Sequence, residues 1–546
     1  MKHIKIIFVG FGCLCAAQSS TAQITAPTAY SNSNNVNYVR IWEAKAPQTD
    51  ASKILVGASV DSFIMTTQYL DGLGRPVQTV MKQLTPLGKD MVTPVVYDVY
   101  GREQYKYLPF AANNTGGNAS LTDGLFKLNP FQQDSAFYHS GNALSPVTGQ
   151  SETWIYGQTA FEFSPINRPY NGYAPGNNWI GATRGTRQQY LVNTVSDSVR
   201  IWTVTSTVSQ APATSGRYAA GELYKNVTTD EHSKQVIEYK DKEERIVLKK
   251  VQLSGSPGTA HVGWLCTYYV YDDWGNLRFV LQPRAVELLL AAASWSISNT
   301  IRDELCFYYG YDSRNRMIIK KVPGAGEVYM VYDARDRLAM TQDANLRNAS
   351  QWLVTLYDTL SRPVQTGLVN NSAIGSKTFS QHLADAVSSY AYPFGPGSIP
   401  SSGYEELTQT GYDNYDNLRS GAPSATFANT FLLSFVTTYL SPPYYARQFL
   451  PTELTKGLVT WTRTRALGTS TFLHTVSIYD DNGRVIQVKS NNYSGGIDTA
   501  TTQYDFSGKI LRTHMAHNKS GNNAHRYRIL TINNYDHGGR LTSISK

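Results

Sequence analysis

Tyr479-Asp480-Asp481-Asn482-Gly483-Arg484 is one copy of a six-residue phrase, Tyr-Asp-x-x-Gly-Arg, that recurs along this chain of 546 residues. Regular copies begin at Tyr97, Tyr271, Tyr311, Tyr332, Tyr357, Tyr412, Tyr479, Tyr504 and Tyr535. In three of them the closing Arg is replaced, by Asn276, Asn417 and Lys509. Two further copies, at Tyr69 and Tyr239, have an extra residue before the Asp. A phrase repeated this often predicts a repeated structural unit, and it argues against a single conventional active site.

Each copy has the composition of a β-turn. Asp in the first position and Gly in the fourth favour a type I turn, in which the Asp side chain accepts backbone hydrogen bonds and Gly adopts a left-handed conformation. Three copies have Asn or Asp in the fourth position (Asn315, Asp336 and Asp416), and these residues also tolerate positive φ. Glu244 and Ser361 break this rule, so we expect their two turns to be looser or differently shaped.

The segments beside the turns have strand character. Residues 475–479 and 328–332 precede a turn and residues 484–489 and 245–250 follow one, and all are rich in β-branched residues. Each unit is therefore predicted to be a β-hairpin, and because a lone hairpin is marginal in water, the units must join edge to edge. The expected fold is all-β, with tandem hairpins in a long, curved or spiralling antiparallel sheet. The Arg could lie over the Tyr ring or pair with the Asp, and the sequence leaves both open.

The chain divides into four expected parts. Residues 1–22 resemble a signal peptide, with Lys2 and Lys5 before a short apolar stretch. An N-terminal domain is expected at 23–165, a loop-rich linker at 166–198, and the hairpin array at 199–546. Within the array we expect a small helical insertion near 283–304, beginning at a proline, and long insertions at 368–411 and 420–470.

Composition and charge narrow the functional classes. The net charge of +8 is scattered, without a basic cluster interleaved with aromatics, so we expect no nucleic-acid partner. The apolar stretch near the N-terminus is too short to span a bilayer and no later stretch is longer, so we expect no integral membrane segment in the mature chain. We predict an exported protein that is extracellular or at the cell surface, with the periplasm as an alternative location. Cys266 and Cys306 could pair or remain buried thiols, and no disulfide is predicted.

Two regions resemble a known family. Tyr69 to Val80, Asp90 to Pro94 and Tyr97 to Phe110 are similar to the uncharacterised domain that opens many RHS/YD-repeat proteins, which are large bacterial surface and secreted proteins. Residues 311–343, with the segment Lys321-Val-Pro-Gly-Ala-Gly-Glu327, resemble the repeat region that follows that domain. The resemblance implies a spiralling sheet that forms a shell around a C-terminal toxic domain. The family's C-terminal core motif and effector are not found in this sequence, so the chain is expected to be a partial shell, a truncated or split product, or an open sheet.

The search for catalytic patterns gives no candidate residues. No Gly-x-Ser-x-Gly elbow, phosphate loop or His-Glu-x-x-His motif occurs. His514, His517 and His525 are the densest histidine group, but positions i and i+3 of a strand face opposite sides, which disfavours a shared metal. Glu243-Glu244 and Asp480-Asp481 are carboxylate pairs at predicted turns, where solvation explains them, and Gly324-Ala325-Gly326 is interpreted as a hairpin loop. We therefore predict no catalytic, cofactor-binding or metal-binding residue, no cofactor and no enzymatic activity.

The sequence thus favours a non-enzymatic, secreted or surface-exposed scaffold resembling the shell part of a toxin-delivery protein. Its expected partner is a toxin cargo or effector encoded downstream. A carbohydrate-binding or adhesion module is the alternative, because exposed tyrosines on a sheet could stack against sugars. A hydrolase within residues 111–200 or the insertions is a third, less favoured, alternative.

Overall fold

A computed structural model describes residues 26–31, 36–117, 120–138, 152–395, 398–430 and 432–546. The chain forms two compact units, one from Met1–Arg40 and Thr66–Arg187 and the other from Ile41–Met65 and Gln188–Lys546. Strands β1 (Asn37–Ala44), β2 (Phe63–Leu70) and β9 (Thr186–Val192) cross the boundaries between these ranges. The expected divisions at 165 and 198 remain predictions, and the expected leader at 1–22 lies outside the described residues.

The first unit has two sets of paired strands and one α-helix in its described part. Strands β2, β3, β4 and β6 pair antiparallel in that order, and β5, β7, β8 and β9 form a second antiparallel series. Their bounds are β3 (Pro76–Met81), β4 (Met91–Pro94), β5 (Tyr105–Tyr107), β6 (Phe110–Ala111), β7 (Tyr156–Phe161) and β8 (Pro169–Tyr173), with α1 at Pro130–Tyr138. Aromatic and aliphatic side chains of these elements, including Tyr69, Val80, Phe110, Phe131 and Tyr156, form the core.

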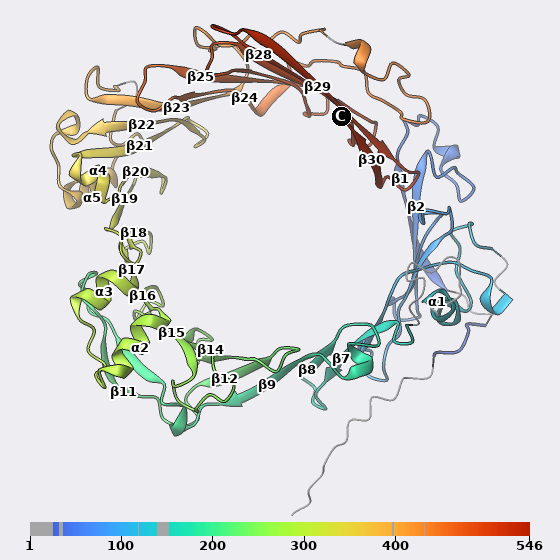
Figure 1. The fold of residues 1–546 in the computed structure, drawn as a ribbon, viewed down its shortest axis with the longest axis horizontal. Coiled ribbons are helices and arrows are strands. Elements are labelled where there is room, and N and C mark those ends of the chain that lie inside the picture. The colour runs from blue at the N-terminus through green and yellow to red at the C-terminus, as the bar shows by residue number, and fades with distance from the viewer. Residues whose placement is uncertain (1–25, 32–35, 118–119, 139–151, 396–397, 431) are drawn as a thin grey trace, which may run out of the picture. The chain divides into compact units, whose positions relative to one another are not determined.

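The second unit is dominated by one antiparallel sheet in which each strand from β12 to β30 pairs with the next in the chain (Figure 1). The first half consists of β12 (Tyr224–Thr229), β13 (Gln235–Lys240), β14 (Ile246–Gln252), β15 (Trp264–Tyr271), β16 (Leu277–Leu281), β17 (Cys306–Tyr311), β18 (Met317–Lys321), β19 (Val328–Tyr332), β20 (Leu338–Gln342) and β21 (Gln351–Tyr357). The second half consists of β22 (Pro363–Asn370), β23 (Tyr404–Asp413), β24 (Thr455–Arg465), β25 (Phe472–Tyr479), β26 (Val485–Asn491), β27 (Ile497–Tyr504), β28 (Ile510–Lys519), β29 (His525–Tyr535) and β30 (Leu541–Ser545). A separate hairpin, β10 (Arg200–Thr203) with β11 (Ala213–Arg217), precedes them. The predicted all-β class and tandem-hairpin organisation are confirmed.

The helical insertion near 283–304 is also confirmed, as two short helices rather than one. Helix α2 (Pro283–Ala291) begins with its proline in the first turn and buries Ala285, Val286 and Leu289. It contacts β15. Ala293 then adopts a φ of 49°, which ends the helical path. Ser298 caps the second helix, α3 (Asn299–Leu305), by accepting a hydrogen bond from the Ile301 N–H.

The long insertions cover parts of the sheet. The first lies between β22 and β23, and its helix α5 (Phe379–Ala386) contacts β19, while α4 (Ala344–Asn348) contacts β20 and β21 (Figure 1). Ala386, Tyr392 and Phe394 from this insertion join Trp352 and Val354 of the sheet in one buried cluster. The second insertion is shorter than the sequence suggests, because Thr455–Arg465 within the expected 420–470 is strand β24.

Buried glutamines attach the second insertion to the sheet. The side-chain amide of Gln487 donates to the Ala428 carbonyl at 3.0 Å and its oxygen accepts from the Ala428 N–H at 2.8 Å. Gln503 makes the same pair of bonds with Val436. Each amide thereby satisfies the donor and the acceptor of one residue of a covering segment, as a neighbouring strand would.

Two further predictions concern cysteine and the membrane. Cys266 and Cys306 are both buried free thiols. Burial raises the pKa of Cys266 to about 11 and that of Cys306 to about 12. Within the described ranges, no helix has both the length and the apolar character needed to cross a bilayer.

Candidate functional site: the contacts between hairpin turns

The repeated phrase forms a turn whose donors and acceptors are satisfied within the phrase. In the copy at Tyr479, the Gly483 N–H donates to the Asp480 carbonyl at 3.0 Å, and the Asp480 N–H donates to the Arg484 carbonyl at 2.9 Å. The Asp480 carboxylate accepts from the N–H groups of Asn482 and Arg484. Between Ile478 and Tyr479 the pairing advances by one residue on β25 and two on β26. This is the three-residue hairpin with a bulge at a left-handed residue.

The fourth position of the turn, where the phrase has Gly, adopts positive φ with Gly, Asn, Asp, Glu or Ser. Gly483 has a φ of 72°, and Asn315 and Asp336 have 58° and 61°. Glu244 and Ser361 have 61° and 65°, with the same hydrogen bonds from their N–H groups to Asp241 and Asp358. The prediction that these two turns are looser or differently shaped is therefore wrong. The two strands and the Asp side chain fix the turn strongly enough to hold a non-glycine residue in the left-handed region.

The arginine makes both of the contacts that the sequence left open, to different copies. Arg337 Nε donates to Asp333 of its own turn at 2.8 Å. Its guanidinium carbon also lies 4.6 Å from the ring centroid of Tyr357, which begins the next copy. The same relation to the next tyrosine holds for Arg75 with Tyr97, Arg245 with Tyr271, Arg316 with Tyr332, Arg362 with Tyr412 and Arg484 with Tyr504, at 4.3–5.2 Å. We call this set of inter-hairpin contacts the Arg–Tyr ladder.

The tyrosine hydroxyl completes the ladder. Tyr357 donates to the carbonyl of Leu338, the residue after Arg337, at 2.9 Å. Equivalent bonds run from Tyr271 to Ile246, Tyr311 to Leu277, Tyr332 to Met317, Tyr412 to Pro363, Tyr504 to Val485 and Tyr535 to Ile510, at 2.8–3.2 Å. In these copies, neighbouring hairpins are therefore joined through side chains as well as the backbone, and the polar groups of the phrase bond to one another.

The copy at Tyr412 departs from the pattern. Here Asp413, and not the fourth residue Asp416, has positive φ, at 70°. The Asp413 carboxylate accepts two hydrogen bonds from Arg362 of the preceding copy and one from the Gly457 N–H. These hydrogen bonds hold the pKa of Asp413 below its usual range. Since β23 continues into the long insertion, this copy closes no hairpin, and its carboxylate instead binds the neighbouring turn.

The two copies with an extra residue place their tyrosine on the opposite face. Tyr69 is 4% and Tyr239 is 0% exposed, whereas the tyrosines of most regular copies are half-buried. Successive residues of a strand point to opposite faces, so one added residue before the Asp reverses the side chain. Tyr239 donates to the buried Asp197 at 2.7 Å instead of joining the ladder. The extra residue before the Asp could therefore have predicted, from the sequence alone, that these two tyrosines are buried.

Two turns with the same hydrogen bonds lack the phrase. At Asp230 and at Asn492 the side chain accepts from the N–H groups two and four residues later, and the Asp230 N–H donates to Lys234 and the Asn492 N–H to Gly496. No tyrosine precedes either residue, so a search for Tyr-Asp missed both. An Asx residue followed three positions later by Ser or Gly would have found them.

The histidine group and the carboxylate pairs noted in the sequence do not form a shared site among the described residues. His514 is buried on β28, while His517 bonds Asp498 at 2.9 Å and His525 bonds the Asn523 carbonyl at 2.6 Å. No group of three potential metal ligands occurs among the described residues. Glu243 pairs with Arg245, and Asp480 and Asp481 pair with Arg484 and Arg447. The Gly324–Gly326 segment forms the loop between the paired strands β18 and β19, as expected.

A cleft of about 590 Å³ lies beside the turns of the copies at Tyr239 and Tyr271. Its lining includes Arg200, Trp202, Glu243, Tyr269 and Trp274. Trp274, at the tip of its turn, is 83% exposed. Arg200 Nε and Trp202 Nε1 are buried without a hydrogen-bond partner in the described structure.

Comparisons with known proteins give a family for the N-terminal part. Residues 40–192 match the family described as "Domain of unknown function (DUF6443)". This agrees with the resemblance of Tyr69 to Phe110 to an uncharacterised opening domain. No curated protein matches the chain.

Similar solved structures come from Tc toxins. A crystal structure of TcdB2-TccC3 matches 88% of this chain and 21% of its own, with a TM-score of 0.40 and 12% identity. The same complex without its hypervariable C-terminal region has a TM-score of 0.39 and 13% sequence identity, over 88% of this chain and 20% of its own. The Tc holotoxin pore of Photorhabdus luminescens has a TM-score of 0.36 and 12% sequence identity, over 93% of this chain and 26% of its own. The chain therefore spans about a fifth to a quarter of the length of these proteins.

Proposed function

We propose that this chain is a non-enzymatic scaffold, an exported wall segment of a toxin-delivery protein. The Arg–Tyr ladder is the observation that carries this proposal. It joins successive hairpins by a cation over a ring and by a hydroxyl-to-carbonyl bond, as with Arg337, Tyr357 and Leu338. Because Asp, Arg and Tyr satisfy one another, the repeated residues extend and stiffen a sheet and leave few groups for chemistry.

The partner expected for such a wall is a polypeptide cargo encoded downstream. The experiment co-expresses the full chain with the polypeptide encoded directly after it and measures co-elution and protease resistance. The scaffold function predicts that the polypeptide co-elutes and is digested more slowly. Arg337→Ala, which breaks one ladder contact, should reduce this protection. Arg284→Ala, which breaks the exposed Arg284–Glu287 ion pair on helix α2, should not. Equal digestion with and without the scaffold would contradict the proposal.

The non-enzymatic part of the proposal has its own test. The purified chain should hydrolyse none of a broad set of glycan and peptide substrates. Turnover that co-purifies with the folded chain and disappears on unfolding would instead favour a hydrolase in the insertions.

The cleft favours carbohydrate binding as a second candidate function. An exposed tryptophan can stack on a sugar ring, and the nearby Glu243 and Arg200 supply hydrogen-bonding groups. Trp274→Ala should abolish binding to any glycan that an array identifies. Tyr493→Ala, at another exposed aromatic, should leave binding unchanged. An array without a ligand, or a ligand that Trp274→Ala still binds, removes this candidate.

A further inference from the structure

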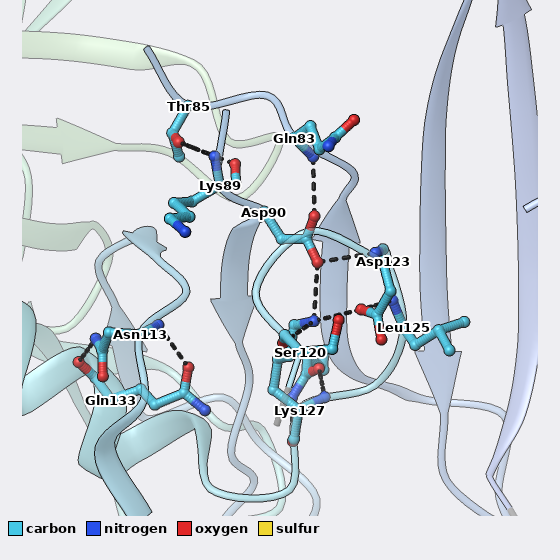
Figure 2. Close-up of polar contacts among 12 residues, drawn as sticks. Gln83, Thr85, Lys89, Asp90, Asn113, Ser120, Asp123, Leu125, Lys127 and Gln133 are labelled. Atoms are coloured by element: carbon cyan, nitrogen blue, oxygen red, sulfur yellow. Dashed lines mark hydrogen bonds and ion pairs between the residues drawn. The ribbon is translucent and has the colours of Figure 1, made fainter. Parts of the chain in front are cut away.

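A lysine and an aspartate meet in the interior of the first unit. Lys127 Nζ lies 2.8 Å from Asp90 Oδ2, and the two side chains are 1% and 0% exposed (Figure 2). Asp123 Oδ1 also lies 2.8 Å from the same nitrogen, with its side chain 31% exposed. The ammonium therefore lies between one enclosed carboxylate and one that reaches solvent.

Hydrogen bonds position both residues. Gln83 N–H donates to Asp90 Oδ1 at 2.9 Å (Figure 2). Gly124 N–H donates to Asp90 Oδ2 at 2.8 Å. On the other side, the Lys127 N–H and carbonyl are both bound by the side chain of Gln78. Lys127 Nζ also donates to the Ser120 carbonyl at 3.1 Å. The nitrogen and the carboxyl group are thus held together before any reaction, which removes most of the entropic cost of bringing them into contact.

Burial favours the uncharged form of the Asp90 carboxyl group. Desolvation raises the pKa of Asp90, although the charge of Lys127 and the hydrogen bonds oppose this. Moving one proton from the ammonium to the carboxylate gives an amine beside a carboxylic acid, and this neutral pair carries a smaller desolvation cost in a buried site than the ion pair that it replaces. Val92 and Ala112, both 0% exposed, belong to the core of this unit.

We propose that Lys127 and Asp90 form an intramolecular amide, an isopeptide bond between the two side chains. The ammonium first gives a proton to the Asp90 carboxylate, and the neutral nitrogen then attacks the Asp90 carboxyl carbon. The new carbon–nitrogen bond replaces the carbon–oxygen bond to the hydroxyl, and a second proton from nitrogen joins that hydroxyl. One water leaves, so an ammonium and a carboxylate become an amide and water with no oxidant or cofactor.

The neighbouring groups have defined roles in this step. Asp123 touches the reacting nitrogen and is the catalytic residue, because it can accept the second proton and deliver it to the leaving hydroxyl. The N–H groups of Gln83 and Gly124 point at the two Asp90 oxygens and stabilise the negative charge that develops on the tetrahedral intermediate. Effective molarities on the order of 10⁵–10⁸ M for such held groups offset the unfavourable equilibrium of amide formation in water.

Peptide mass spectrometry of the folded full chain tests the proposal. Trypsin should fail to cleave after Lys127, and the Lys127 peptide should appear joined to the Asp90 peptide at their summed mass less one water. Lys127→Arg should give two linear peptides, whereas Lys106→Arg, at an exposed lysine, should keep the cross-link. Linear peptides from folded wild-type protein, after prolonged incubation across pH 5–8, would overturn the proposal.

The role of Asp123 is tested by the rate. Wild-type protein is unfolded before it can cross-link, refolded, and sampled over time for the joined peptide. Asp123→Asn should slow the appearance of that peptide by at least about a hundredfold, the usual size of a lost general acid–base contribution. An unchanged rate would refute the mechanism. Because the wild-type cross-link is read directly, the proposal stays testable even where a variant fails to fold.

Discussion

The guanidinium of Arg337 lies over the ring of Tyr357, and the hydroxyl of Tyr357 donates to the carbonyl of the residue that follows Arg337. The two residues belong to successive copies of the repeated phrase, so this contact joins one repeat to the next. Arg337 Nε meanwhile bonds Asp333 within its own turn. One side chain therefore holds both the shape of a hairpin and its attachment to the next.

Removing the hydroxyl of Tyr357 tests the ladder bond. Tyr357→Phe keeps the ring under Arg337 and loses the bond to Leu338, so we expect a loss of about 1 kcal/mol in the free energy of unfolding. Tyr493→Phe, at a tyrosine that is 72% exposed, should change it by less than about 0.5 kcal/mol. Urea unfolding followed by circular dichroism measures both, and equal effects would argue against a structural ladder.

Removing an arginine should cost more where its aspartate is buried. Arg337→Ala leaves the 2%-exposed Asp333 side chain without its cation, and we expect a loss of about 2–3 kcal/mol. Arg540→Ala breaks the same pair where the side chains are 42% and 19% exposed, and should cost less than about 1 kcal/mol. The urea midpoints of the two variants measure the difference. A larger effect at Arg540 would contradict the burial argument.

The left-handed residue of an atypical turn offers a stabilising substitution. Ser361 has a φ of 65°, which a side chain disfavours, so Ser361→Gly should raise the free energy of unfolding by up to about 1 kcal/mol, less the extra chain entropy of glycine. Thr359→Gly, in the same turn but outside the left-handed region, should lower it by about 0.5–1 kcal/mol. Thermal unfolding gives the sign of each change, and a destabilised Ser361→Gly would disprove the strain.

Asp134 should make the first unit less stable as pH rises. Its carboxyl on α1 is fully buried, both oxygens lack a partner among the described residues, and desolvation raises its pKa to about 9. The folded state thus keeps a proton that the unfolded chain releases near pH 4, so the stabilising contribution is complete below pH 4 and is lost progressively up to about pH 9.

Replacing this carboxyl tests that pH dependence. Asp134→Asn should remove the decline between pH 5 and 8 and raise the free energy of unfolding at pH 7 by roughly 2–4 kcal/mol. Urea unfolding at several pH values, with Glu103→Gln at an exposed carboxylate of the same unit for comparison, gives the slopes. Parallel slopes for wild type and Asp134→Asn would show that Asp134 is not the group responsible.

The repeating turn and its flanking strands could be predicted from the amino-acid sequence alone, because they depend on residues close together in the chain. The hydrogen bond from the Gly483 N–H to the Asp480 carbonyl closes one turn, and the β-branched, broadly alternating residues after Arg484 predict a strand. The sequence also contained the signal that reverses Tyr239, since one added residue changes the face of a strand whatever the surroundings.

The contacts that those turns make could not be predicted without the packing of the strands. Tyr412 lies under Arg362 although a long insertion separates them. The Asp413 carboxylate bonds that arginine of the preceding copy. Lys127 and Asp90 likewise meet because the strands around them pack, and no local pattern joins the two positions. Turn geometry follows from the dihedral preferences of a few adjacent residues, whereas these contacts depend on which strand lies beside which.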